Sequence, residues 1–207
     1  MTTPIEEPLL LAHRPVHGSE DAIRRYCGLS WSGGGPEVWA YAYYDAVETD
    51  PQTLAPSDVT AAAALHPSLS RGDLEFFANR RADFEAWLAA TPGDVQLADA
   101  SDDDLAGLDP FGAVEGVSLA LLTKVLHRKR PHLVPLVDRH VLDWYRPVTG
   151  ERAAVAAWRP LLRALRDDLR TNASTLAALT ERLGADMDTP PSQLRCVDIA
   201  LWMGGHR

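Results

Sequence analysis

Apolar residues recur every three or four positions in this chain, and this spacing excludes most folds that are not helical. Residues 71–90, for example, place Leu74, Phe77 and Phe84 on one face of a helix. Residues 160–170 repeat the pattern with leucines, after a proline that suits the first position of a helix. Few segments alternate apolar and polar residues for long enough to form strands. We therefore expect an all-α fold.

Residues that favour helix ends bound the expected helices. Ser19 and the two acidic residues after it open the first helix, and Gly28 ends it. Prolines make residues 131–137 an extended link, and Asp138 opens the next helix. The expected helices span residues 19–27, 57–65, 71–90, 118–129, 138–145, 160–170, 172–183 and 192–203.

The composition indicates a globular protein, with 46% hydrophobic and 24% charged residues among 207. We predict one compact domain over residues 1–207, with an acidic lobe at 1–110 and a basic lobe at 111–207. No run of about 18 apolar residues occurs, so no membrane span is expected. The N-terminus lacks a basic region before its apolar patch, which predicts a cytoplasmic protein without a signal peptide.

Two cysteines, Cys27 and Cys196, are too few for a disulfide scaffold or a multi-cysteine zinc site. His127, His132 and His140 do not share metal-ligand spacing with an acidic partner. We therefore predict neither a metal ion nor a cofactor. The sequence does not indicate an oligomeric state.

Charge is distributed unevenly, although the net charge is −9. Residues 1–115 hold 6 Lys and Arg against 20 Asp and Glu, whereas residues 116–207 hold 14 against 9. A phosphate backbone responds to the local potential, so an acidic protein with one basic face can still bind DNA. Two solvated surfaces of different composition are the alternative.

The most informative stretch is GVSLALLTKVLHRKRPHLVPLVDRHVLDWY, residues 116–145. A hairpin of small residues precedes an amphipathic helix that ends in basic residues, and a proline-rich link leads to Asp138. Backbone N–H groups in a hairpin beside a helix N-terminus can hold a phosphate oxygen. A carboxylate fixed nearby can stabilise a cation or activate a water molecule.

This layout resembles the helix-hairpin-helix/Gly-Pro-Asp superfamily of base-excision DNA glycosylases. In that superfamily a Leu-Pro-Gly-Val-Gly hairpin precedes a helix, and an essential aspartate follows in a Val-Asp-x-His-Val-like segment. Gly116 and Val117 match the hairpin, and residues 137–141 match the aspartate segment with Asp138. The resemblance implies a two-lobed helical fold, duplex DNA as the partner and catalysis by Asp138.

A closer resemblance is to an uncharacterised bacterial family distantly related to that superfamily, and it implies a fold more than a function. It is strongest over residues 116–145 and 191–203. The matching residues are Gly116, Val117, Lys124, Leu126, Arg128, Lys129, Arg130, Pro131, Leu133, Pro135, Asp138, Leu194, Arg195, Asp198, Trp202 and Met203.

Three positions depart from the glycosylase pattern. Ser118 stands where the hairpin has its second glycine, and Glu115 stands where it has a proline. Ala120 occupies the position of the nucleophilic lysine of bifunctional glycosylases. The resemblance therefore implies hydrolysis by a monofunctional enzyme rather than Schiff-base lyase chemistry.

Asp138 is the predicted catalytic residue. Trp39 and Tyr43, in a segment rich in aromatic residues, are candidates to hold an unstacked base. The predicted nucleic-acid contacts are Gly116, Val117, Ser118, Lys124, Arg128, Lys129, Arg130, Arg139 and His140.

Each candidate has a structural alternative. Asp138 can act only as a helix cap, and cations after a helix interact with its dipole whatever the function. An aromatic segment is typical of a core. Arg163, Arg166 and Arg170 form either a phosphate track or the exposed face of an amphipathic helix. Arg195 and Asp198 indicate an ion pair that docks the last helix.

The predicted function is that of a DNA-glycosylase-like protein, which binds DNA and excises an altered base by hydrolysing its N-glycosidic bond. One alternative is a non-catalytic member of the fold that binds DNA or another protein. Another is an enzyme acting on a small nucleoside-like or natural-product substrate. The sequence does not identify the base or lesion.

Overall fold

The computed structural model describes residues 7–29, 40–65, 68–151 and 153–204, and most of them are helical. This confirms the expected all-α class. One two-stranded antiparallel hairpin is added, in which β1 (Leu9–Leu11) pairs with β2 (Arg14–Val16). None of the helices in these ranges has both the length and the apolar composition needed to cross a bilayer.

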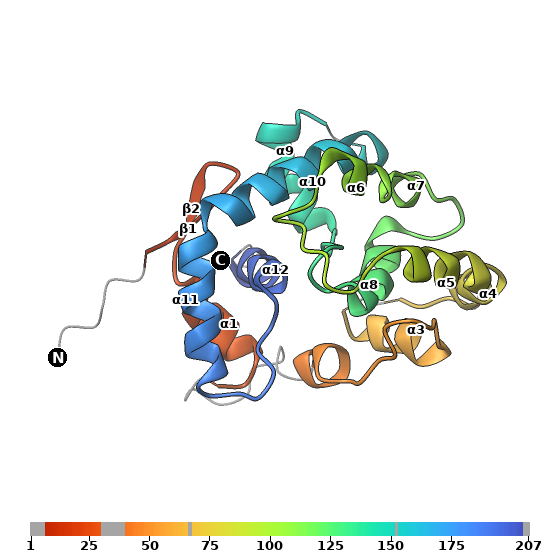
Figure 1. Ribbon diagram of the computed structural model, residues 1–207, viewed down its shortest axis with the longest axis horizontal. Coiled ribbons are helices and arrows are strands. Elements are labelled where there is room, and N and C mark those ends of the chain that lie inside the picture. The colour runs from red at the N-terminus through yellow and green to blue at the C-terminus, as the bar shows by residue number, and fades with distance from the viewer. Residues whose placement is uncertain (1–6, 30–39, 66–67, 152, 205–207) are drawn as a thin grey trace.

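The helices vary from single turns to a rod of five turns, and they are numbered as in Figure 1. In chain order they are α1 (Ser19–Tyr26), the π-helix η1 (Tyr41–Asp45), α3 (Pro56–Ala62), the 3₁₀ turn η2 (Ala63–Leu65), α4 (Arg71–Asn79), α5 (Arg81–Ala90), α6 (Asp102–Ala106), α7 (Asp109–Gly112), α8 (Leu119–Lys129), α9 (Arg139–Thr149), α10 (Ala154–Thr171), α11 (Ala173–Gly184) and α12 (Gln193–Gly204).

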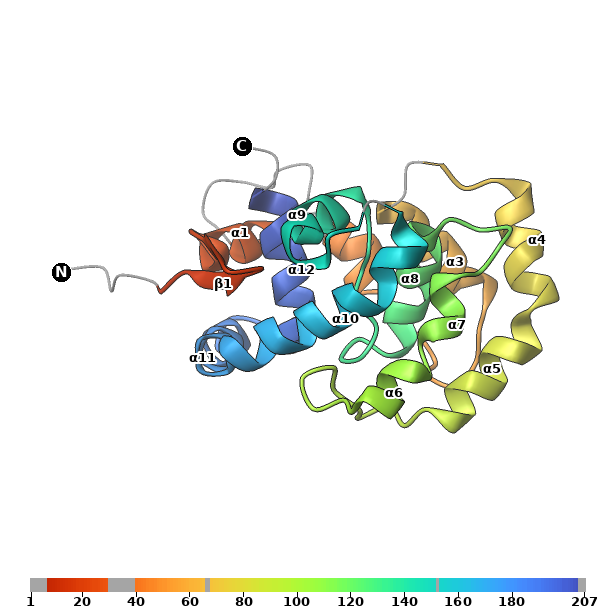
Figure 2. The same cartoon turned by 90° about the horizontal axis from the view of Figure 1, so that it is seen from above.

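Two groups of helices lie side by side, and α9 and α10 connect them (Figure 1). The hairpin, α1, α11 and α12 form one group, and α3, α4, α5 and α8 form the other. Helix α1 packs on α12, whereas α8 packs on α3. Figure 2 shows α10 crossing from α7 toward α11. Each group contains segments from both halves of the chain.

The β1–β2 hairpin turns through two residues with positive φ, Ala12 at 51° and His13 at 61°. These values suit the mirror-image turns of tight hairpins, although they disfavour residues with a side chain. The Ala12 N–H donates to the buried Asp168 carboxylate at 2.8 Å, and the Tyr145 hydroxyl donates to the same oxygen at 2.7 Å. Tertiary contacts thus hold a turn that lacks the usual turn residues.

Several helix boundaries differ from the expected ones, and the two largest differences are in the segments 71–90 and 154–171. The predicted helix over 71–90 is interrupted at Arg80, and the turn there lets Phe76 and Phe84 pack with ring centroids 6.2 Å apart. Helix α10 begins at Ala154 rather than at Pro160. Pro160 lies on the exposed side, so the carbonyl that lacks its N–H partner can bind water instead.

Candidate functional site

Asp138 ends the extended link and caps the N-terminus of α9, as its position in the sequence predicts. Its Oδ1 accepts hydrogen bonds from the backbone N–H groups of His140 at 2.8 Å and Val141 at 3.1 Å. Its Oδ2 has no hydrogen-bond partner among the residues that the structure describes. The half-buried side chain lines a cavity of about 500 Å³. One carboxylate oxygen is therefore fixed, and the other is available to a ligand.

The cavity beside Asp138, here called the Asp138 pocket, also contains the start of α8. Leu119 and Ala120 line it opposite α9, so two segments of the motif that are distant in sequence meet there. Arg146 on its wall pairs with Asp143. Ala120 lines the pocket at the position where the glycosylase resemblance places a lysine. No lysine is among the described residues lining the pocket.

The hairpin predicted to hold a phosphate, residues 116–118, has backbone N–H groups without partners in the described part of the chain. Gly116 has φ of 90°, which a residue with a side chain rarely adopts. Ser118 caps α8, and its Oγ accepts from the Leu121 N–H at 3.2 Å. The N–H groups of residues 116–118 donate no hydrogen bond within the described part of the chain. Gly116 and Ser118 are exposed, so these donors can reach a ligand.

The basic residues of α8 and of its C-cap, Arg130, are inside the protein, which argues against their predicted role as DNA contacts. Lys124, Arg128, Lys129 and Arg130 are each at most 8% exposed. The ammonium group of Lys124 donates to the Leu65 carbonyl at 2.6 Å, and burial lowers its pKa. A buried charge needs close partners, and all four side chains have them.

Arg128, Lys129 and Arg130, here called the cation clamp, bind the segments packed around the C-terminus of α8. The Arg128 guanidinium donates to the Tyr44 carbonyl and, at 3.1 Å, to the Val47 carbonyl. The ammonium group of Lys129 lies 2.5 Å from the buried Asp58 carboxylate.

Arg130 completes the clamp. It donates to the carbonyls of Thr91 at 2.8 Å, Pro51 at 2.7 Å and Leu88. Carbonyls at the ends of helices lack partners within the helix, so a cation there satisfies them and opposes the helix dipole. The cation clamp therefore holds the chain after η1 and the end of α5 against α8.

A second buried network docks α12. Arg195 binds Asp45 through two bonds, Nε to Oδ1 at 2.8 Å and Nη2 to Oδ2 at 3.0 Å. Its Nη2 also donates to the Tyr26 hydroxyl at 2.5 Å. The predicted pairing with Asp198 is looser, at 3.6 Å. No local pattern points to Asp45, because it lies far from Arg195 in the chain.

Asp198 connects this network to the Asp138 pocket. Burial raises the pKa of Asp198 to about 8, with the charges of Arg195 and Asp138 acting in opposite directions. Its Oδ2 accepts from the Leu136 N–H at 3.2 Å. Leu136 lies in the link that ends at Asp138, so the last helix helps to position that residue.

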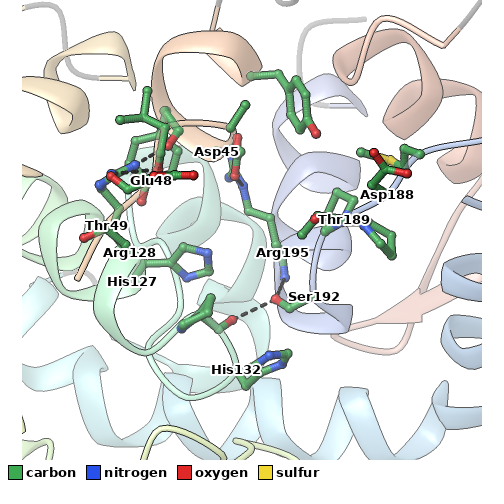
Figure 3. A pocket seen from close by; sticks show the side chains of 18 residues that line it. Asp45, Glu48, Thr49, His127, Arg128, His132, Asp188, Thr189, Ser192 and Arg195 are labelled. Atoms are coloured by element: carbon green, nitrogen blue, oxygen red, sulfur yellow. Dashed lines mark hydrogen bonds and ion pairs between the residues drawn. The ribbon is translucent and has the colours of Figure 1, made fainter. Parts of the chain in front are cut away.

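A larger cavity of about 610 Å³ lies between η1, α8 and the loop before α12, and is here called the His127 cavity (Figure 3). His127 and Arg128 line one side, and Asp188, Thr189 and Ser192 line the other, with Arg195 between them. This cavity could not be predicted from the sequence, because its walls come from three separate parts of the chain.

The aromatic residues predicted to hold a base do not meet at Asp138. Tyr43 is 64% exposed and lines neither cavity. Trp39 lies outside the described residues. Of the remaining predicted contacts, Arg139 is exposed on the wall of the Asp138 pocket, whereas Val117 and His140 are half-buried. Arg163, Arg166 and Arg170 of α10 lie near acidic side chains. Asp102, for example, pairs with Arg163 at 2.9 Å.

Residues 19–205 match the model of DUF6308, a family of unknown function, and the chain belongs to that family. No curated protein and no solved structure matches the chain.

Proposed function

We propose that this member of the DUF6308 family is a DNA-glycosylase-like hydrolase that removes an altered base at the Asp138 pocket. The observation that carries the proposal is the placement of Asp138. Two backbone N–H groups fix one of its oxygens, and the other is available in a cavity beside the start of α8. A carboxylate held in this way is preorganised to face positive charge that develops on a substrate.

The proposed reaction is hydrolysis of an N-glycosidic bond. The bond between sugar carbon and base nitrogen breaks, the departing base takes a proton, and the sugar acquires oxocarbenium character next to Asp138. Water then bonds through its oxygen to the sugar carbon, keeps one hydrogen as the new hydroxyl group and gives up the other as a proton. That proton replaces the one that the departing base took from solvent. The lining of the pocket supports water as the nucleophile, because Ala120 stands where a Schiff-base lysine would be needed.

The open N–H groups of residues 116–118 and the exposed Arg139 support contact with a DNA backbone. This set of contacts is smaller than the predicted one, since Lys124 and the cation clamp are buried. DNA binding in this proposal therefore depends on few phosphates and on the fit of one nucleotide in the pocket.

The burial of Lys124 and of the cation clamp also favours a second candidate function, hydrolysis of a small nucleoside-like substrate. The net charge of −9 opposes a duplex, and no cation of α8 is exposed to compensate for it. The pocket volume of about 500 Å³ lies within the range of sites for small molecules. The role of Asp138 is the same in both cases.

Release of free base tests the proposal. The full chain is incubated with duplexes carrying a panel of deaminated, alkylated and oxidised bases, and separately with the corresponding nucleosides. Asp138→Asn keeps a helix cap but loses the charge, so we expect base release to fall by roughly 100-fold or more while the fold is kept. Asp103→Asn, at an exposed position of α6, is the matched control and should retain full activity.

Release from duplexes supports the first candidate, and release from nucleosides alone supports the second. Failure of the wild-type chain to release any base from either set would overturn the proposed function. Full activity of Asp138→Asn would overturn the mechanism.

A further inference from the structure

The His127 cavity is a second candidate ligand site, and the observations that support it are independent of the Asp138 pocket. It is enclosed by the end of η1, by α8 and by residues 187–192 (Figure 3). Its volume of about 610 Å³ is ample for a ligand of one or two rings.

His127 supplies an acceptor without a partner in this cavity. The side chain is 3% exposed, and its Nδ1 lies 2.7 Å from the Val134 carbonyl oxygen. A carbonyl can only accept, so Nδ1 carries a proton. Burial, assisted by the charge of Arg195, lowers the pKa of His127 to about 4, so Nε2 is unprotonated at neutral pH.

The Nε2 lone pair has no hydrogen-bond partner in the part of the chain that the structure describes. The imidazole ring lies on the cavity wall in Figure 3. The residue is almost fully buried, but Nε2 is not sealed off, so a donor that enters the cavity can reach it. A ligand with an N–H or O–H group can provide that donor.

The cations of the cavity wall are already bound within the protein. Arg195 binds Asp45 through two hydrogen bonds, and Arg128 donates to backbone carbonyls. An anionic ligand would have to displace these partners. Glu48 and Asp188 also line the cavity, are exposed, and form no ion pair within the described ranges. Their charges attract a cation and repel an anion.

The remaining walls offer flat apolar surfaces. Tyr41, Met187 and the prolines 131, 190 and 191 line the cavity. Aromatic rings and proline faces pack well against a planar ligand. We propose that the His127 cavity binds a planar nitrogen base, neutral or cationic, that donates an N–H hydrogen bond to His127 Nε2.

Benzamidine is the probe, because it is a planar cation with N–H donors, and benzoate is its anionic counterpart of the same shape. Both are titrated into the full chain by calorimetry and by ¹⁵N NMR of the histidine rings. We expect benzamidine to bind at least roughly tenfold more tightly than benzoate and to move the Nε2 resonance of His127. The NMR readout uses the wild-type chain and needs no variant to fold.

Variants then locate the site. His127→Phe removes the acceptor, and we expect benzamidine affinity to fall by roughly tenfold. The double variant Glu48→Gln and Asp188→Asn removes two exposed charges, and we expect a loss of roughly threefold. Asp94→Asn, an exposed acid distant from the cavity lining, is the matched control and should bind as the wild type does.

Three results would overturn the proposal. One is benzoate binding as tightly as benzamidine, and another is a His127 resonance that does not move at saturation. The third is the absence of benzamidine binding at millimolar concentration. None of them affects the test of base release at Asp138.

Discussion

The two ends of α8 have opposite environments. At its N-terminal end, Leu119 and Ala120 are half-buried and face the Asp138 pocket. At its C-terminal end, every residue from Leu121 to Arg130 is buried, including the cation clamp. The end with the higher positive charge is therefore the end whose cations are bound inside the protein.

This difference shows what a basic tract can mean in a sequence. Long charged side chains are usually exposed, so a run of three cations at the end of a helix predicts a basic surface. Here the segment after η1 and the end of α5 leave carbonyls without partners, and the clamp binds them. We therefore place contact with the proposed DNA substrate at the N-terminal end of α8, beside the Asp138 pocket.

Removing one member of the clamp should cause the largest loss of stability. Arg130→Met leaves the carbonyls of Pro51 and Thr91 without their donor, and the Leu88 carbonyl keeps only the Thr91 N–H. We expect the free energy of unfolding in urea to fall by roughly 3–5 kcal/mol. Arg163→Met removes an exposed arginine of α10 and should cost less than about 1 kcal/mol. Equal losses in the two variants would contradict the structural role of the clamp.

The contribution of His127 to the free energy of unfolding should be smaller than that of Arg130 and should depend on pH. Its pKa in the folded protein is about 4, below the ordinary value of 6.5, so folding favours the neutral ring. This contribution to the free energy of unfolding is fully present at pH values above the ordinary pKa of 6.5. It is lost as the pH falls from there to the folded-state pKa of about 4. The loss across this interval is about 3 kcal/mol.

The measurement compares urea unfolding of the wild type and of His127→Phe at several pH values across that interval. The difference in unfolding free energy between the two should shrink as the pH falls. A difference that stays constant with pH would contradict a buried, neutral His127.

Local features of the site were predictable from the sequence. Asp138 opens α9 because an aspartate after an extended proline-rich link suits a helix cap. Helix α8 was expected over residues 118–129 and spans Leu119–Lys129. The docking of the last helix through Arg195 was also indicated, although its main partner was not.

Features that depend on distant parts of the chain were not predictable. The partners of the cation clamp are mostly backbone carbonyls, which every residue has and which leave no pattern in a sequence. Asp45 and Arg195 meet only because η1 and α12 pack together. The break at Arg80 and the turn at Ala12 likewise depend on tertiary contacts.

The most direct test of the account is binding to a duplex that carries a stable abasic-site analogue, compared with the undamaged duplex across salt concentrations. We expect preference for the abasic duplex, with a logarithmic salt slope of about −1, because Arg139 is the one cation among the proposed DNA contacts. Arg139→Gln should make that slope shallower by about one. Equal binding to both duplexes, or no binding at low salt, would contradict the account.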